Sequence, residues 1–224
     1  MLISKKELII LIRESSKESS KESGHSYVYI ADSQGESGIG KAIKKRLGPA
    51  NRDENYFQKS GATAEKIRNL YGDKIKSAVK NTYNIIITLG GNGSSMASYL
   101  AKDILENAPE DAKITWILAP PNNRPNNKKI YDPKFSKGKW GIPFENAIKD
   151  EFINKKKKLR KKYNEQIIYG INAVEKMLNM KGRINIIDPF PWFESNITSS
   201  RDGVHVDDNP GESYIATINS ELYN

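Results

Sequence analysis

The sequence contains no cysteine, only two histidines and no long apolar run. Without cysteine, neither disulfides nor thiolate metal sites can form. No apolar stretch approaches the roughly 20 residues of a membrane-spanning helix. The apolar residues 8–12 form a shorter run than the ~7–15 residues of a signal-peptide core. We therefore predict no signal peptide and no transmembrane segment. The predicted location is the cytoplasm of the producing cell, with lysis or packaging into a virion as an export route.

Positive charge is in excess. The chain has 36 Lys and Arg against 27 Asp and Glu, which gives a formal net charge of +9. An excess of this size favours anionic partners, such as nucleic acid or an acidic cell-surface polymer. It is equally typical of a Lys- and Asn-rich sequence that has no such partner. Charge alone therefore leaves the partner open.

Apolar strand-like runs alternate with helical patterns along most of the chain. The predicted strands are residues 27–31, 56–57, 83–89, 114–119 and 184–187. Alternation at this spacing predicts one parallel, doubly wound sheet with helices on both faces. Before it, residues 1–23 form a polar, helical N-terminal extension that contains a Ser/Lys/Glu repeat, and we assign residues 24–224 to one domain. The apolar residues 8–12 are a hypothetical docking surface for a partner.

Three segments outside the predicted strands also bear on function. Residues 122–141 form a long polar segment, predicted to be a substrate-binding flap. Residues 143–180 have the pattern of one long helix or two shorter ones. Residues 190–201 are predicted to be an aromatic loop that forms the pocket wall together with the flap.

Each polar cluster with chemical potential follows a predicted strand. Ser33 follows the first strand, Gly61 the second, Asn92 the third, and Asp202 with His205 the fifth. Because carboxyl ends of parallel strands meet at one edge of a sheet, we expect these residues to share a crevice. Taken alone, an Asp-Ser turn is typical of a helix cap, and a glycine-rich run is typical of a tight turn. Their shared position at one edge of the sheet favours a functional site.

The residue types at this edge predict nucleophilic catalysis. The other histidine, His25, precedes the first strand and would lie at the opposite edge, so His205 is the candidate base. Asp202, three residues earlier, can orient its imidazole, and Ser33 would be the nucleophile. The N–H groups of Ser33 and Gly61 and the amide of Asn92 would form the oxyanion hole.

Four blocks in this order resemble those of the SGNH (GDSL-type) hydrolases. Residues 31–33 (Ala-Asp-Ser), 60–62 (Ser-Gly-Ala), 90–93 (Gly-Gly-Asn-Gly) and 202–205 (Asp-Gly-Val-His) are similar to the four family blocks. The chain departs from them in two places, since Ala31 replaces the first glycine and the third-block aspartate is Gly93. The resemblance implies a three-layer α/β/α sandwich around a mostly parallel, five-stranded, flavodoxin-like sheet. It also implies ester hydrolysis through an acyl-enzyme, with no metal or organic cofactor.

Three functions follow as hypotheses. The first is a serine esterase that removes an O-acetyl or other short acyl group from a glycan or cell-surface polymer. The second is a structural or binding component of a larger assembly, such as a phage particle, with or without esterase activity. The third is nucleic-acid binding through residues 155–162. This run is charged on nearly all sides, as in a solvated helix, and lacks aromatics for base stacking, so we do not favour the third. The glycine-rich residues 33–40 fit no nucleotide-binding motif.

Overall fold

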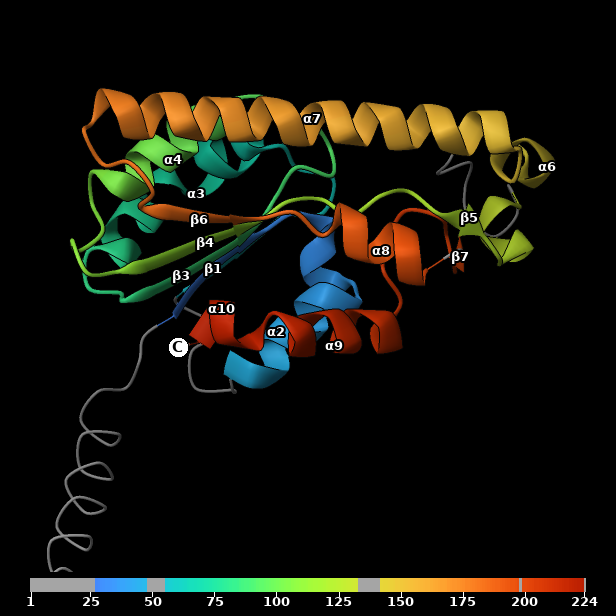
Figure 1. Ribbon diagram of the computed structural model, residues 1–224, viewed down its shortest axis with the longest axis horizontal. Coiled ribbons are helices and arrows are strands. Elements are labelled where there is room, and N and C mark those ends of the chain that lie inside the picture. The colour runs from blue at the N-terminus through green and yellow to red at the C-terminus, as the bar shows by residue number, and fades with distance from the viewer. Residues whose placement is uncertain (1–26, 48–54, 133–141, 198, 224) are drawn as a thin grey trace, which may run out of the picture.

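The computed structural model describes residues 27–47, 55–132, 142–197 and 199–223 (Figure 1). The predicted extension, residues 1–23, lies outside the described residues. The same is true of residues 133–141, the second half of the predicted flap. The division of the chain into an extension and one domain thus stays a prediction.

The core of the molecule is a sheet of five parallel strands in the order β2-β1-β3-β4-β6. The strands are β1 (Tyr27–Ala31), β2 (Tyr56–Gln58), β3 (Asn84–Thr88), β4 (Lys113–Ile117) and β6 (Ile184–Ile187). All five were predicted from runs of β-branched and aromatic residues, which suit strands covered on both faces. The strand order is the flavodoxin-like one.

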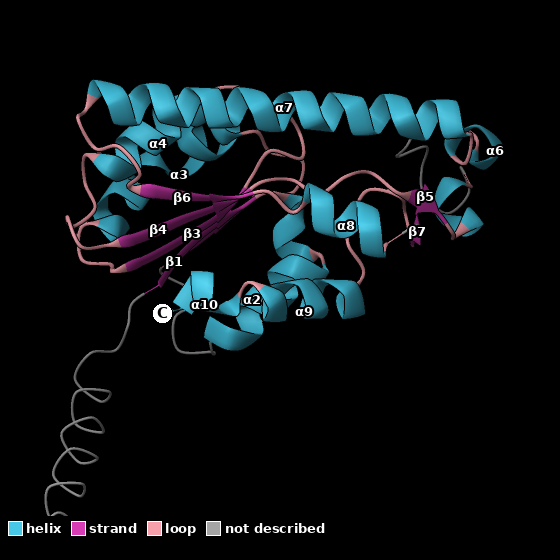
Figure 2. Cartoon of the chain, viewed as in Figure 1, coloured by secondary structure: helices cyan, strands magenta, loops and turns pink. Residues whose placement is uncertain are grey.

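Helices cover both faces of this sheet (Figures 1 and 2). The helical elements are η1 (Ser33–Glu36), α2 (Gly38–Leu47), α3 (Ala64–Val79), α4 (Ala97–Leu105), η3 (Lys128–Tyr131), α6 (Phe144–Ala147), α7 (Asp150–Met177), α8 (Phe190–Asn196), α9 (Asp208–Thr217) and α10 (Asn219–Tyr223). One face packs against α3, α4 and α7, and the other against α2, α8, α9 and α10. The predicted three-layer α/β/α sandwich is therefore confirmed.

Strand periodicity divides the core in two. In β1, Val28 and Ile30 belong to the core beneath α3, α4 and α7, whereas Tyr29 and Ala31 belong to the opposite core. The central strand β3 alternates in the same way. Because successive side chains of a strand point to opposite faces, a strand between two helical layers buries both sets of side chains and is largely apolar.

The predicted aromatic loop is wrong in its first half, which folds as helix α8. The carboxylate of Asp188 accepts a hydrogen bond from the N–H of Phe190 at 3.0 Å and fixes the entry to the helix. Phe193 is fully buried, and its ring centroid lies 4.8 Å from that of Trp192 and 5.0 Å from that of Tyr214. These aromatics thus build core rather than a loop wall, because burying their area stabilises the fold more than exposing it.

The segment after the flap forms a short helix, α6, and a 28-residue helix, α7. The amide of Asn164 fixes α7 to the chain beyond β4, since its Nδ2 donates to Ala119 O at 2.9 Å and its Oδ1 accepts from Ala119 N at 3.3 Å. Residues 27–47, 55–132, 142–197 and 199–223 include no helix with the length and apolar character needed to cross a bilayer.

A short loop and a small second sheet extend the carboxyl edge of the main sheet. Strand β5 (Arg124–Pro125) pairs in parallel with β7 (Ser199–Ser200), and the sequence pattern did not predict either strand. Their pairing ties the first half of the predicted flap to the chain that leads to His205. The flap is thus held by backbone hydrogen bonds and not only by its ends.

Helices α2 and α9 approach each other at two glycines. A Cβ atom added to Gly211 would lie 2.1 Å from the carbonyl carbon of Gly38, and one added to Gly38 would lie 2.0 Å from Asp207 O. Real Cβ atoms are essentially never this close to backbone atoms, so only glycine permits this contact. Because α9 directly follows the loop that carries His205, the contact also places that loop.

Replacing Gly211 with alanine should therefore destabilise the protein. We expect Gly211→Ala to lower the free energy of unfolding by about 3 kcal/mol, because the backbones of α2 and α9 must separate. The matched control is Gly72→Ala in α3, where the nearest heavy atom to the new Cβ is Arg68 Cγ at 3.7 Å. That change should stabilise the protein by about 0.5–1 kcal/mol. Urea unfolding measures both, and equal stability of Gly211→Ala and wild type would contradict the packing argument.

Candidate active site

The first element of the candidate site is the turn that follows β1. Asp32 caps the short helix η1, and its Oδ1 accepts a hydrogen bond from Gln34 N at 2.8 Å. Ser33, the first residue of η1, is half-buried. Local sequence explains the turn, because an Asp before a short helix satisfies an N–H that has no partner inside the helix. The cap thereby fixes the backbone beside the predicted nucleophile.

The second element is the turn formed by residues 202–205. Asp202 Oδ1 accepts hydrogen bonds from the N–H groups of Val204 (2.9 Å) and His205 (2.8 Å), while its Oδ2 lies 2.7 Å from His205 Nδ1. Gly203 has φ +75°, and a Cβ there would lie 2.8 Å from Asn123 O, so the turn requires glycine. This arrangement orients the imidazole as predicted.

Two hydrogen bonds bring these turns together. Gly38 N donates to Val206 O at 2.8 Å, and Gln34 Nε2 donates to Val204 O at 3.4 Å. The accepting carbonyls lie on either side of His205 in the sequence, so the two bonds fix the His205 backbone against η1 and the start of α2. From the other side, the hydroxyl of Tyr131 donates to Asp202 O at 2.7 Å.

All five predicted site residues line one cavity, which we call the reaction groove. Its volume is about 970 Å³. The predicted residues in its lining are Ser33, Gly61, Asn92, Asp202 and His205, and its other charged lining residues include Lys41, Arg201 and Asp208. Ser33, Gly61 and Asn92 follow β1, β2 and β3, as expected for the carboxyl edge of a parallel sheet. Asp202 and His205 follow β7 of the small second sheet, because α8 and β7 lie between them and β6.

The Nε2 atom of His205 is buried, and it forms no hydrogen bond within the part of the chain described here. An unpaired buried polar atom costs about 1–3 kcal/mol, so this nitrogen is available for a partner that enters the groove. The Ser33 hydroxyl lines the same groove, also without a hydrogen bond to a described group. Hydrogen bonds between a base and a nucleophile are often long or absent before substrate binds.

The predicted oxyanion-hole donors differ in whether they already donate a hydrogen bond within the protein. Among described groups, neither the N–H of Ser33 nor that of Gly61 has a hydrogen-bond acceptor. Gly61 has φ +71°, a backbone conformation that glycine adopts without strain. The Asn92 amide, in contrast, donates to Ala62 O at 3.2 Å and to Asp32 Oδ2 at 3.4 Å. Asn92 is thus held at the groove by the turn that carries Ser33.

A buried pair of opposite charges, which sequence patterns missed, lies behind the groove. Asp32 is fully buried, and its Oδ2 also accepts a hydrogen bond from Gly91 N at 3.1 Å. Burial raises the pKa of Asp32, while the Gln34 N–H, the Arg160 charge and the Gly91 N–H act in the opposite direction. Burial likewise lowers the pKa of Arg160, which the charge of Asp32 counteracts.

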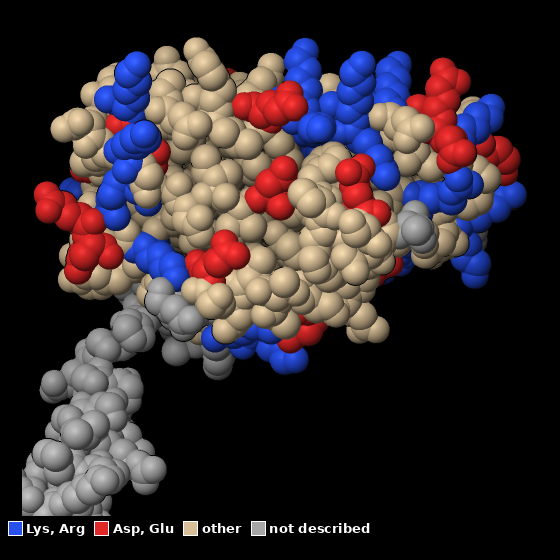
Figure 3. Space-filling model, in the orientation of Figure 1, with Lys and Arg blue, Asp and Glu red and all other residues tan. Residues whose placement is uncertain are grey.

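Arg160 corrects one sequence-based expectation. The basic run 155–162 was interpreted as a helix solvated on nearly all sides, yet Arg160 is only 5% exposed. Its Nη1 donates to Pro120 O at 3.3 Å. The spacing of Arg160 could have indicated its burial. Arg160 lies four residues before Asn164, the next buried polar residue of α7, and residues i and i+4 share one face of a helix. The other basic residues of the run are exposed or half-buried (Figure 3).

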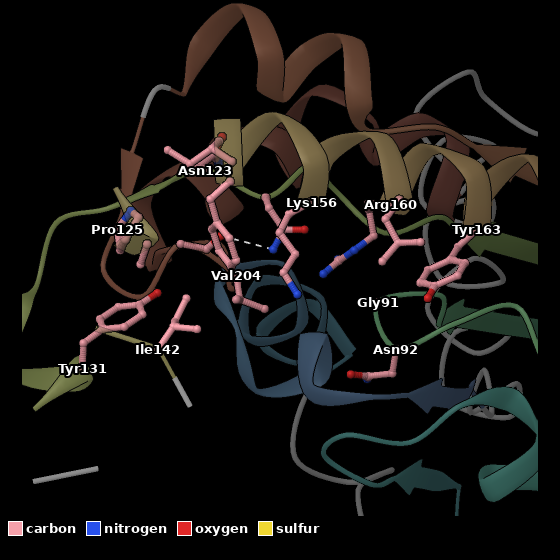
Figure 4. A pocket seen from close by; sticks show the side chains of 16 residues that line it. Gly91, Asn92, Asn123, Pro125, Tyr131, Ile142, Lys156, Arg160, Tyr163 and Val204 are labelled. Atoms are coloured by element: carbon pink, nitrogen blue, oxygen red, sulfur yellow. Dashed lines mark hydrogen bonds between the residues drawn. The ribbon is translucent and has the colours of Figure 1, made fainter. Parts of the chain in front are cut away.

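A second cavity adjoins the reaction groove, and we call it the side cavity (Figure 4). It has a volume of about 280 Å³ and is lined by Gly91, Asn92, Asn122, Asn123, Pro125, Tyr131, Ile142, Ala147, Phe152, Ile153, Lys156, Leu159, Arg160, Tyr163, Gly203 and Val204. Asn92 and Val204 line both cavities. The predicted flap contributes Asn122, Asn123, Pro125 and Tyr131 to its wall, whereas helix α8 contributes none.

Residues 27–47, 55–132, 142–197 and 199–223 hold no cluster of three or more His, Asp or Glu side chains suited to a metal ion. The carboxylates of Asp32 and Asp202 already accept hydrogen bonds from protein groups. Asp202 binds His205 and two N–H groups, and Asp32 binds two N–H groups and the Asn92 amide. The described side chains of the groove therefore suit proton transfer and hydrogen bonding.

The Asp202–His205 pair predicts a dependence of stability on pH. Burial would raise the pKa of Asp202, but hydrogen bonds from the ring and N–H of His205, its charge and the Val204 N–H outweigh this and lower it to about 2. A carboxyl whose pKa is lower in the folded state stabilises fully above its unfolded pKa and loses this stabilisation as the pH falls. The free energy of unfolding should therefore fall by about 2 kcal/mol between about pH 4 and about pH 2 because of this group.

The variant Asp202→Asn should lack this part of the decline. Urea unfolding of wild type and variant at several pH values between 2 and 5 measures the difference. An exposed aspartate changed in the same way, Asp111→Asn, is the control and should retain the wild-type decline. Parallel curves for Asp202→Asn and wild type across this window would show that the carboxylate contributes no such stabilisation.

Neither protein-family models nor curated protein sequences match this chain. Solved structures that are similar to it include the lipase Lip_vut3 from a goat rumen metagenome, with 16% identity, a TM-score of 0.49 and coverage of 89% of this chain and 98% of that one. A lipase/acylhydrolase from Enterococcus faecalis has 12% identity and a TM-score of 0.49, with coverage of 88% and 97%. The catalytic domain of Streptococcus pneumoniae peptidoglycan O-acetyltransferase A, with a methylsulfonyl adduct, has 12% identity and a TM-score of 0.46, with coverage of 88% and 92%.

Similarity at these identities concerns the fold alone. The fold itself is established by the strand order, by the parallel pairing of every neighbour in the sheet and by the helical layers on both faces. These features are those that the four sequence blocks implied. The chain has a three-layer α/β/α fold around a flavodoxin-like parallel sheet.

Proposed function

We propose that this protein is a serine ester hydrolase that works through an acyl-enzyme. The observation that carries the proposal is the state of His205, whose Nδ1 is bound to Asp202 while its buried Nε2 has no hydrogen-bond partner among described groups. This is the arrangement that a general base needs, with one nitrogen oriented and the other available. Ser33 lines the same groove and carries the hydroxyl that the base would deprotonate.

In the proposed reaction, Ser33 Oγ attacks the ester carbonyl carbon and its proton passes to His205 Nε2. The carbonyl oxygen becomes an oxyanion that accepts hydrogen bonds from the N–H groups of Ser33 and Gly61. The intermediate then collapses, the C–O bond to the alcohol breaks, and His205 gives the alcohol its proton. Asp202 remains ionised and stabilises the imidazolium, as its pKa of about 2 allows.

Hydrolysis of the acyl-enzyme repeats these steps with water. His205 Nε2 takes a proton from water, whose oxygen attacks the acyl carbon, and Ser33 Oγ leaves with the proton from His205. Asn92 would join the oxyanion hole by exchanging its long 3.4 Å contact with Asp32 for one with the oxyanion. Its bond to Ala62 O at 3.2 Å would keep the amide in place during this exchange.

The proposed substrate class is a glycan or cell-surface polymer that carries O-acetyl or other short acyl esters. The similar solved structures are named as lipases, acylhydrolases or an O-acetyltransferase. These names all refer to reactions of acyl groups. The net charge of +9 and the Lys and Arg side chains that gather along α7 would attract an acidic polymer (Figure 3). The open groove of about 970 Å³ has room for a chain of sugars.

The nucleophile can be tested with a short-chain activated ester such as 4-nitrophenyl acetate. We expect wild type to hydrolyse it and Ser33→Ala to lose at least about 10³-fold in kcat, because the acyl-enzyme can no longer form. The control Ser95→Ala changes an exposed serine whose hydroxyl binds Glu65, and should keep full activity. A fluorophosphonate probe should add its phosphonyl mass to wild type but not to Ser33→Ala. Wild-type activity no greater than that of Ser33→Ala would defeat the proposal.

The oxyanion hole gives a second test. Asn92→Ala should lower kcat by about 10²–10³-fold with little change in KM, because the amide stabilises the oxyanion more than the ground-state carbonyl. Steady-state kinetics on the same ester measures this effect. Asn196→Ala, at an exposed asparagine that binds only within α8, is the matched control. An unchanged kcat in Asn92→Ala would exclude Asn92 from the oxyanion hole.

A further inference from the structure

The side cavity has the shape and position of a subsite for one unit of the substrate. Its volume of about 280 Å³ is near the lower end of small-molecule sites, so it would hold a single ring and not a chain. Because Asn92 and Val204 line both cavities, a ring bound there would lie directly beside the reaction groove. A group attached to that ring could then reach Ser33.

The walls of the side cavity are largely apolar and aromatic. Phe152, Leu159 and Tyr163 come from α7, while Pro125 and Tyr131 come from the segment before residue 133 (Figure 4). Sugar rings present C–H faces that pack on such surfaces and hydroxyls that need polar partners. Asn122 and Asn123 add amide groups to the wall. The lining therefore suits a ring with both apolar and polar faces.

The charge of the side cavity is entirely positive. Its charged lining residues are Lys156 and Arg160, and no Asp or Glu lines it among the described residues. Arg160 is buried, and its charge is balanced by that of Asp32. Lys156 forms no ion pair with a described residue, and its Nζ lies 5.4 Å from the centroid of the Phe152 ring. Lys156 therefore carries the uncompensated charge at this cavity.

We propose that the side cavity binds a carboxylate-bearing sugar ring of the substrate, with Lys156 pairing with the carboxylate. Lys156 is exposed, and its ammonium group matches the single charge of a carboxylate, to which it can donate a charge-assisted hydrogen bond. This subsite rests on the proposed esterase function, since the ester on the bound sugar would be the one presented to Ser33. It makes Lys156 a determinant of specificity and not a catalytic residue.

The test uses two O-acetylated substrates that differ in one carboxylate, the methyl glycosides of glucuronic acid and of glucose. Wild type should have a kcat/KM about tenfold higher for the acetylated glucuronoside, through a lower KM. In Lys156→Met, which keeps the length of the side chain without its charge, this preference should disappear because KM for the glucuronoside rises, with kcat unchanged. Hydrolysis of the glucoside and of 4-nitrophenyl acetate should not change.

Lys158→Met is the matched control, because Lys158 lies on the same helix, is exposed and does not line the side cavity. It should keep the wild-type preference, which shows that the effect is not a general loss of positive charge. Equal kcat/KM for the two glycosides in wild type would overturn the subsite. So would a preference that survives in Lys156→Met.

Calorimetry with Ser33→Ala separates this inference from the esterase proposal. Tighter binding of methyl glucuronoside than of methyl glucoside, lost in Ser33→Ala/Lys156→Met, would support the subsite even if no ester were hydrolysed. Absence of activity on 4-nitrophenyl acetate would count against the esterase alone. Equal binding of the two glycosides to Ser33→Ala would overturn the subsite whatever the activity. The preference should also weaken as salt is added.

Discussion

The buried carboxylate of Asp32 is the interaction on which the candidate site depends. It accepts hydrogen bonds from Gln34 N in the turn after β1 and from Gly91 N and the Asn92 amide after β3, and it offsets the charge of Arg160 in α7. A buried charge is tolerated only when it is hydrogen-bonded and balanced in this way. One side chain thus joins the turn that carries Ser33, the loop that carries Asn92 and the long helix α7.

A second constraint positions His205. The contact between Gly38 and Gly211 lets α2 and α9 pack backbone to backbone, and Gly38 N binds the carbonyl that follows His205. His205 and Ser33 therefore reach the same groove through two contacts. A glycine contact positions His205, and a buried carboxylate positions the turn of Ser33. Gly38, Gly211 and Asp32 do not line the reaction groove, so its walls are fixed by contacts outside its lining.

Helix α7 connects the two cavities. Its inward polar residues Arg160 and Asn164 bind carbonyls at the end of β4, and this fixes the helix over the carboxyl edge of the sheet. Lys156 and Arg160, four residues apart, consequently line the side cavity (Figure 4), whereas the other lysines of the run do not. A single basic run thus contains a buried structural charge, a cavity charge and a solvated surface.

The sequence by itself determined the five strands, the alternation of helices and the edge at which Ser33, Gly61, Asn92, Asp202 and His205 collect, because apolar periodicity and strand-end position are local properties. The burial of Asp32 and Arg160 and the position of Lys156 at the side cavity were decided only by the tertiary structure. Each depends on which distant backbone groups or cavities lie within a few ångströms, and a charged residue in a sequence carries no mark of its burial. The same reason explains why helix α8 was mistaken for a loop, since its aromatic side chains are stabilised by a core that only the folded chain provides.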